Sequence, residues 1–79
     1  MNLKELQSKY HNKTVRVDSF YTLPEVDYIV TSVIDIMGEF VFAVRDVNYT
    51  IETKRWYTFK CATLEEMELV ASRFRIIDG

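Results

Sequence analysis

Tyr28–Phe59, YIVTSVIDIMGEFVFAVRDVNYTIETKRWYTF, is the stretch of sequence that decides the fold. β-branched and aromatic residues alternate with polar ones along it, and one glycine, Gly38, separates two apolar runs. Alternation with a period of two is typical of strands with one buried face, and a glycine between two such runs is typical of a hairpin turn. The stretch therefore predicts a strongly curved antiparallel sheet as the centre of the molecule.

The parity of the apolar residues predicts how the two strands of this hairpin pair. We expect strands at 27–36 and 39–47, and in both the large apolar residues lie at even positions. Even positions must then face even positions if one face of the pair is to be buried. The predicted inner face consists of Tyr28, Val30, Ile34, Phe40, Phe42 and Val44.

Parity also predicts the turn. A three-residue turn over 36–38, with its glycine left-handed at a bulge, pairs Ile34 with Phe40 and Val30 with Val44. A two-residue turn would instead place even positions opposite odd ones. We therefore predict the three-residue turn, although it sets the like charges of two carboxylates opposite each other at the solvated end of the hairpin.

Short elements flank this sheet. Asn2 with Glu5 forms a capping box for an N-terminal helix, and Thr63 with Glu66 forms one for a second helix of about two turns. Alternation predicts further strands at 14–20, 55–61 and 73–77, the second with its odd positions buried and Trp56, Thr58 and Lys60 outward. The proline in 20–25 predicts a projecting loop after the first strand.

The predicted order is helix, four strands, short helix and final strand, in one domain of residues 1–79. This mainly β arrangement, α+β by content, resembles the SH3-like small five-stranded barrels, a group that includes Tudor-type modules. The resemblance covers residues 13–78 and concerns topology, with 20–25 as the proline-bearing loop and the N-terminal helix as an addition. The alternative architecture is an open antiparallel α+β sheet with both helices on one face.

Composition bounds the function. The 79 residues are 48% hydrophobic and 28% charged, which is typical of an ordered globular domain near the lower size limit for a single core. A core this small rarely spares a deep pocket, so we expect no enzyme. One cysteine, no secretory signal and no long apolar segment predict a cytoplasmic protein without a membrane anchor.

Charge is uneven along the chain. Residues 19–53 hold one basic and six acidic groups, whereas residues 54–79 hold five basic and four acidic groups, and the net charge is −2. Proteins that bind a phosphate backbone usually carry a basic excess, so the acidic middle argues against nucleic acid as the first choice. The charges more often form a mixed, solvated surface.

Few side chains suggest chemistry. His11 is the only histidine, at the predicted end of a helix, and Cys61 lies on the predicted inner face of a strand, where a buried inert thiol is expected. Asp35 and Glu39 would meet at the hairpin end, where solvated charges are commoner than a catalytic pair. We therefore expect no catalytic residues, no cofactor and no metal.

An aromatic cluster is the best candidate for a binding surface. Trp56 faces outward on its strand, unless it packs under the N-terminal helix, and aromatic residues dominate binding hot spots. Basic residues flank it and could support stacking of a nucleic-acid strand. The predicted partner-binding residues are Trp56, Tyr49, Ile51, Tyr21, Arg55 and Lys60, with Lys54 nearby.

Three functions remain open at this point. The first is a non-catalytic protein-interaction module, the second a small barrel that binds single-stranded nucleic acid, and the third a structural homodimer. Small single-domain chains that start at a methionine and lack targeting signals are often encoded by phages or mobile elements, as adaptors or inhibitors of host proteins. The aromatic cluster makes the interaction module the leading hypothesis, binding one protein partner or itself, and a host protein as that partner is a background expectation that does not come from the residues.

Overall fold

In the computed structural model, which describes residues 1–77, two helices and five strands follow one another in the predicted order. The predicted domain extends to Gly79, and residues 78–79 lie outside the described part. The elements are α1 (Leu3–Tyr10), β1 (Thr14–Val17), β2 (Asp27–Ile36), β3 (Glu39–Asp46), β4 (Trp56–Cys61), α2 (Leu64–Ser72) and β5 (Phe74–Ile76).

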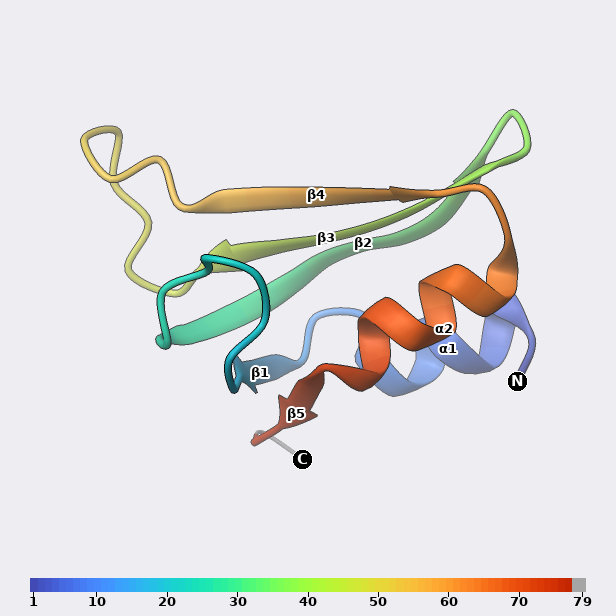
Figure 1. Cartoon of the computed structure of the whole chain (residues 1–79), viewed down its shortest axis with the longest axis horizontal. Coiled ribbons are helices and arrows are strands. Elements are labelled where there is room, and N and C mark those ends of the chain that lie inside the picture. The colour runs from blue at the N-terminus through green and yellow to red at the C-terminus, as the bar shows by residue number, and fades with distance from the viewer. Residues whose placement is uncertain (78–79) are drawn as a thin grey trace.

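The strands form one antiparallel sheet in the order β4-β3-β2-β1-β5 (Figure 1). β1 to β4 follow as a meander, and β5 returns to pair with the other side of β1. Within the described residues β4 and β5 do not pair, so the sheet is open and the predicted closed barrel is not formed. The fold is a small, mainly β, α+β domain.

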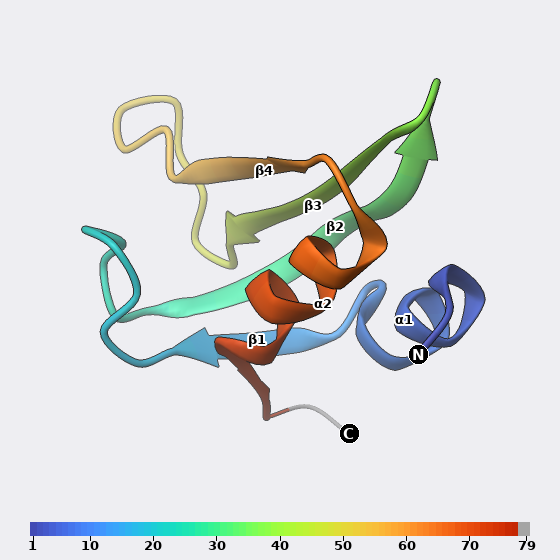
Figure 2. The same ribbon diagram turned by 45° about the vertical axis from the view of Figure 1, so that its right-hand side comes forward.

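Both helices pack on the same face of the sheet, as in the alternative architecture (Figure 2). Leu6 of α1 and Met67 of α2 are almost fully buried and share one core cluster with Phe42 of β3. The fold thus has two layers, with the core between the helices and the curved sheet.

Local chemistry explains where the elements begin and end. The Asn2 side chain accepts from the Glu5 backbone N–H at 2.8 Å, and Glu5 accepts from the Asn2 backbone N–H at 3.1 Å, which confirms the first capping box. At α2 only half of the second box forms, because Glu66 accepts from the N–H of Ala62 and not from that of Thr63.

β1 is shorter than predicted because the backbone turns after Val17. Ser19 and Tyr21 have φ values of 52°, in the left-handed region that a strand cannot continue through. The predicted strand over 14–20 therefore ends at residue 17, and residues 18–26 form the connection to β2. This connection holds the predicted proline loop.

The predicted three-residue turn between β2 and β3 is wrong. Ile36 pairs with Glu39, so Met37 and Gly38 form a two-residue turn with φ values of 53° and 85°. Asp35 does not face Glu39; its carboxylate accepts from the Gly38 N–H at 2.9 Å. A side-chain bond therefore stabilises the turn where we expected like charges to meet.

The extra residue lies inside β2 and not at the turn. The register shifts between Val30 and Ser32, so Thr31 is bulged, and its hydroxyl donates to the Ala43 carbonyl at 3.3 Å. The predicted pairing of Val30 with Val44 is confirmed, whereas Ile34 pairs with Val41. Beyond the bulge the buried position is accordingly Val33, and Ile34 is on the opposite face.

Candidate functional site

The side of the sheet away from the helices, which we call the outer face, is not covered by any described element. Cross-strand partners share a face, so Trp56, Thr58 and Lys60 of β4 define it. Behind Lys60 lie Val41 and Ile34, and behind Thr58 lie Ala43 and Ser32. Val41 and Ala43 are buried beneath their neighbours, so the exposed apolar side chains of this face are Trp56 and Ile34, and the face is a candidate contact surface at these two residues.

Trp56 is exposed, and it does not pack under α1. Half of its surface, 51%, is accessible, and the Tyr49 ring lies edge-on to it with centroids 5.9 Å apart. Ile51, in the connection between β3 and β4, is 75% exposed. The structure thus brings Trp56 and Tyr49 into contact and places Ile51 in the same connection.

The basic residues near Trp56 differ in their surroundings. Arg55 Nη1 lies 3.3 Å from Oδ2 of the buried Asp46, so part of its charge is balanced within the protein. Lys60 is exposed and forms no ion pair within residues 1–77. Arg45, which pairs with Trp56 across the strands, has a buried Nε that lacks a hydrogen-bond partner in that range.

Tyr21 belongs to a different surface from Trp56. It is 78% exposed, and its ring stacks on that of Phe59, with centroids 6.3 Å apart and planes at 15°. Phe59 alternates with Thr58 and Lys60 along β4, so its ring lies on the opposite side of the strand from Trp56. The predicted cluster is therefore divided between the two sides of β4.

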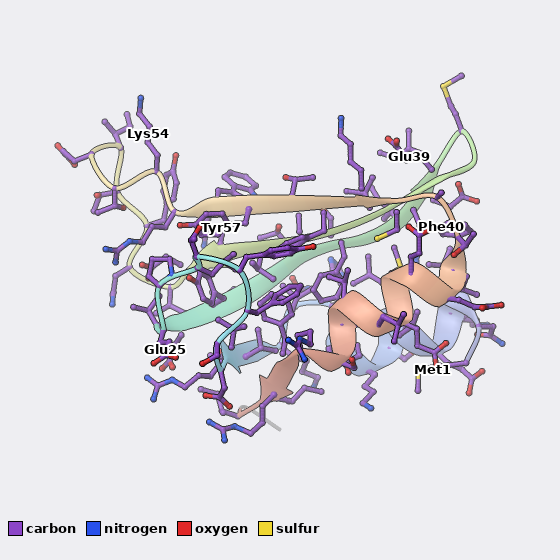
Figure 3. The ribbon with its side chains drawn as sticks, viewed as in Figure 1. Met1, Glu25, Glu39, Phe40, Lys54 and Tyr57 are labelled. Carbon is purple, nitrogen blue, oxygen red and sulfur yellow. The ribbon has the colours of Figure 1, made fainter. Side chains whose placement is uncertain are left out.

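A groove of about 710 Å³ lies between β4 and α2, and we call it the β4–α2 groove. β4 and α2 join at one end and diverge toward the connection between β1 and β2 (Figure 1). Figure 3 shows Tyr57 projecting from β4 toward the helix side of the sheet, with Lys54 at the far end from Phe40. The lining includes Phe20, Tyr21, Phe59, Lys60, Leu69 and Arg73.

Three kinds of site can be assessed in the described residues: a reactive thiol, a metal centre and a membrane-spanning helix. Cys61 is buried, as predicted, and burial together with the nearby Glu66 carboxylate raises the pKa of its thiol, which keeps it protonated and unreactive. Residues 1–77 contain no group of three or more His, Cys, Asp and Glu able to hold a metal ion. Within the same range no helix is long and apolar enough to span a membrane.

Sequence reasoning missed the groove. Leu69 is 69% exposed, and Arg73 lies over the Phe20 ring at 5.3 Å. A signal was present, because Leu69 falls off the apolar stripe of α2 defined by Met67 and Ala71. A single exposed leucine is common on protein surfaces, so this signal alone could not have located the groove.

No protein-family model matches the chain, and neither the curated proteins nor the solved structures yield a significant match. The two surfaces of β4 are therefore the candidate binding surfaces of the described residues.

Proposed function

We propose that this protein is a non-catalytic protein-interaction module that binds a partner through β4 and the connection before it. The observation that supports this proposal most is the half-exposed Trp56, in contact with Tyr49 on a sheet face that neither α1 nor α2 of the described chain covers. Tryptophan and tyrosine are the residues that most often carry binding energy at interfaces. If a partner covers these two rings, their apolar surface is removed from water, which stabilises the complex.

We also propose that this chain is an opened variant of the SH3-like small barrels, which it resembles in the order of its elements, with a helix between the last two strands. The larger helix α2 occupies the space between the edges β4 and β5. As a cytoplasmic adaptor or inhibitor encoded by a phage or mobile element, such a module would bind a host protein.

The test is capture of the partner from the source cell, followed by reconstitution with the purified partner. Trp56→Ala is expected to weaken the dissociation constant by more than about tenfold, as a hot-spot residue does. Ile77→Ala is the matched control, because Ile77 is also about half exposed, at 47%, and lies away from β4. Equal affinity of the Trp56→Ala variant and the wild type would contradict the proposed surface.

Single-stranded nucleic acid is the second candidate, because Lys54 and Lys60 flank Trp56. An oligothymidylate would then quench Trp56 fluorescence at low salt, and the quenching would weaken as salt rises. Absence of salt-sensitive quenching would exclude this candidate. The third candidate, a homodimer, predicts a mass of twice the monomer in light scattering on a size-exclusion column, and a monomer at all concentrations would contradict it.

A further inference from the structure

β4 has a free backbone edge. The Asp46 N–H donates to the Arg55 carbonyl at 2.8 Å, so hydrogen-bonded pairs with β3 occur at residues 55, 57, 59 and 61 of this segment. The backbone groups of Thr58 and Lys60 then point away from β3. Within residues 1–77 these backbone groups form no hydrogen bond on the edge of β4 that faces away from β3. Two successive donor and acceptor pairs are therefore open to another strand.

The β4–α2 groove runs beside this free edge. Its lining includes both Thr58 and Lys60 of the edge and Leu69 and Arg73 of α2. An extended chain laid along β4 would alternate its side chains between the groove and the outer face. Side chains pointing into the groove would contact Phe59 and Leu69, and those pointing outward would lie beside Trp56, Thr58 and Lys60.

The charge of the β4 edge indicates which kind of peptide strand would pair with it. Residues 54–61, KRWYTFKC, carry three basic groups and no acidic one, in a chain whose net charge is −2. Arg73, which lines the opposite side of the groove, forms no ion pair within the described residues. Glu66 also lines the groove and keeps its negative charge although it accepts from the Ala62 N–H, so the charged lining consists of two cations, Lys60 and Arg73, and one carboxylate. An acidic strand is therefore complementary to the edge.

The same charges disfavour a second copy of β4. Two segments that each carry three basic groups and no acidic one would repel when paired edge to edge. Lysine on an edge strand is also a common means by which proteins prevent pairing with their own copies. A strand of opposite charge removes this repulsion and converts it into attraction.

We propose that β4 binds an extended, acidic peptide segment of the partner as an additional strand, with alternate apolar side chains in the β4–α2 groove. This proposal rests on the proposed function and specifies the chemistry of the partner. Main-chain hydrogen bonds to Thr58 and Lys60 supply part of the affinity, and the groove and Lys60 supply the sequence preference. The expected ligand alternates apolar residues with Asp or Glu.

The probe is a displayed library of random linear peptides of about ten residues, the upper length of ordinary strands. Selection on the wild-type chain is expected to enrich peptides that alternate apolar and acidic residues. The enriched peptide is then titrated against variants. Recovery of no peptide, or of peptides without acidic residues, would overturn the proposal.

Thr58→Pro is the decisive variant because it removes the outward N–H and leaves the β3 ladder intact. It is expected to weaken peptide binding by more than about tenfold, whereas Thr58→Ala, which keeps the N–H, changes it by less than about threefold. Lys60→Glu is expected to weaken binding at low salt, with a smaller effect at high salt. Equal binding by Thr58→Pro and Thr58→Ala would overturn the proposal.

Amide hydrogen exchange of the wild-type chain gives a second measurement, which stays valid if Thr58→Pro does not fold. The N–H groups of Thr58 and Lys60 are expected to exchange more slowly by at least about tenfold when the selected peptide is bound. Unchanged exchange would overturn the proposal. So would a dimer of the free chain that becomes monomeric in Thr58→Pro but not in Thr58→Ala, since the edge would then bind a second copy.

The two proposals fail in different ways. If the captured partner loses affinity for Trp56→Ala but not for Thr58→Pro, the interaction module stands and strand addition is rejected. If neither variant affects the captured partner, while the selected peptide still depends on Thr58, the proposed partner surface is rejected.

Discussion

Tyr28 combines a buried ring with a satisfied hydroxyl. Its O–H donates to the Pro24 carbonyl at 2.6 Å, and its ring lies edge-on to Tyr57 and Phe74. The pKa of Tyr28 is raised from 10.0 to about 12. The main cause is burial, because a phenolate would lose its hydration there, and the neighbouring Tyr57 and Asp46 add smaller contributions. One residue thus links the proline loop to the core.

This pKa predicts a loss of stability in alkali. The folded pKa lies above the unfolded value, so the contribution of Tyr28 is fully present below pH 10 and disappears as pH rises toward about 12. Urea unfolding across this range should show a free energy of unfolding that falls more steeply for the wild type than for Tyr28→Phe. At neutral pH the variant should be less stable by about 1 kcal/mol, the net value of one hydrogen bond. Parallel slopes for the two proteins would contradict the assignment.

For single residues, the sequence predicts which side of a strand each side chain faces, but it does not predict which distant residues that side chain contacts. The predicted burial of Cys61 is confirmed, whereas Tyr57 and Phe59, also predicted to be buried, are half-buried at the edge of the sheet. Alternation places Trp56 on the outward side of its strand but leaves open whether α1 covers it, and the structure shows it exposed. The position of Tyr21 against Phe59 could not be predicted. It depends on the left-handed backbone of Tyr21, which no local pattern signals.

The β2–β3 hairpin illustrates a turn with an unsuited residue. Met37 and Gly38 both have positive φ, which glycine adopts easily and methionine does not. The Met37 side chain is fully exposed and loses no packing when it is replaced. The turn therefore stores backbone strain that a residue tolerant of this conformation would relieve.

We expect Met37→Asn to raise the free energy of unfolding by about 0.5–1 kcal/mol, because asparagine tolerates the left-handed region. Gly38→Ala should lower it by about 1 kcal/mol although a Cβ there meets no atom within 4 Å, so the loss would come from backbone strain alone. Chemical denaturation of both variants measures the two effects. A destabilised Met37→Asn protein would show that the turn does not keep this conformation.

Parity could not locate the bulge in β2. A three-residue turn at Gly38 and a bulge at Thr31 both place Val30 opposite Val44, so they agree over the first half of the strand. They differ beyond the bulge, where the predicted turn buries Ile34 and the observed register buries Val33, and both residues are β-branched and apolar. The hydrogen bond from the Gly38 N–H to the Asp35 carboxylate stabilises the observed two-residue turn, and the sequence alone does not reveal this bond.

At the scale of the whole molecule, Phe74 joins the last strand to the core. Its ring lies within 6.4 Å, centroid to centroid, of the rings of Phe20, Tyr28, Phe42 and Phe59. It is 3% exposed although β5 is only three residues long. The buried Phe74 ring therefore anchors β5 to the core, although the strand is too short to be held by its backbone hydrogen bonds alone.

We expect Phe74→Ala to lower the free energy of unfolding by about 3–5 kcal/mol, the usual cost of truncating a buried phenylalanine. A domain of this size has a total of about 5–15 kcal/mol at most, so a large part of its stability would be lost. Phe74→Leu, which keeps most of the apolar volume, should lose less. Thermal unfolding followed by circular dichroism tests the order, and an equal loss in both variants would contradict it.

The order and type of elements could be predicted from the sequence, whereas closure of the sheet could not. Closure requires β4 and β5 to come within hydrogen-bonding distance, and α2 packs against both strands. With nine residues and a buried face of Met67 and Ala71, α2 fills the side on which a barrel would close. A sequence pattern specifies the face of a helix but not the space between two strands that are far apart in the chain.

The pairing of β1 with β5 has a consequence for synthesis on the ribosome. β1 is made early, but the strand that pairs with its other side, and the Phe74 ring that the surrounding rings enclose, come near the end of the described residues. The nascent chain must therefore hold its aromatic side chains in an incomplete cluster until residue 76 has left the exit tunnel. We expect a late, cooperative final step of folding, with no stable native-like intermediate on the ribosome before it.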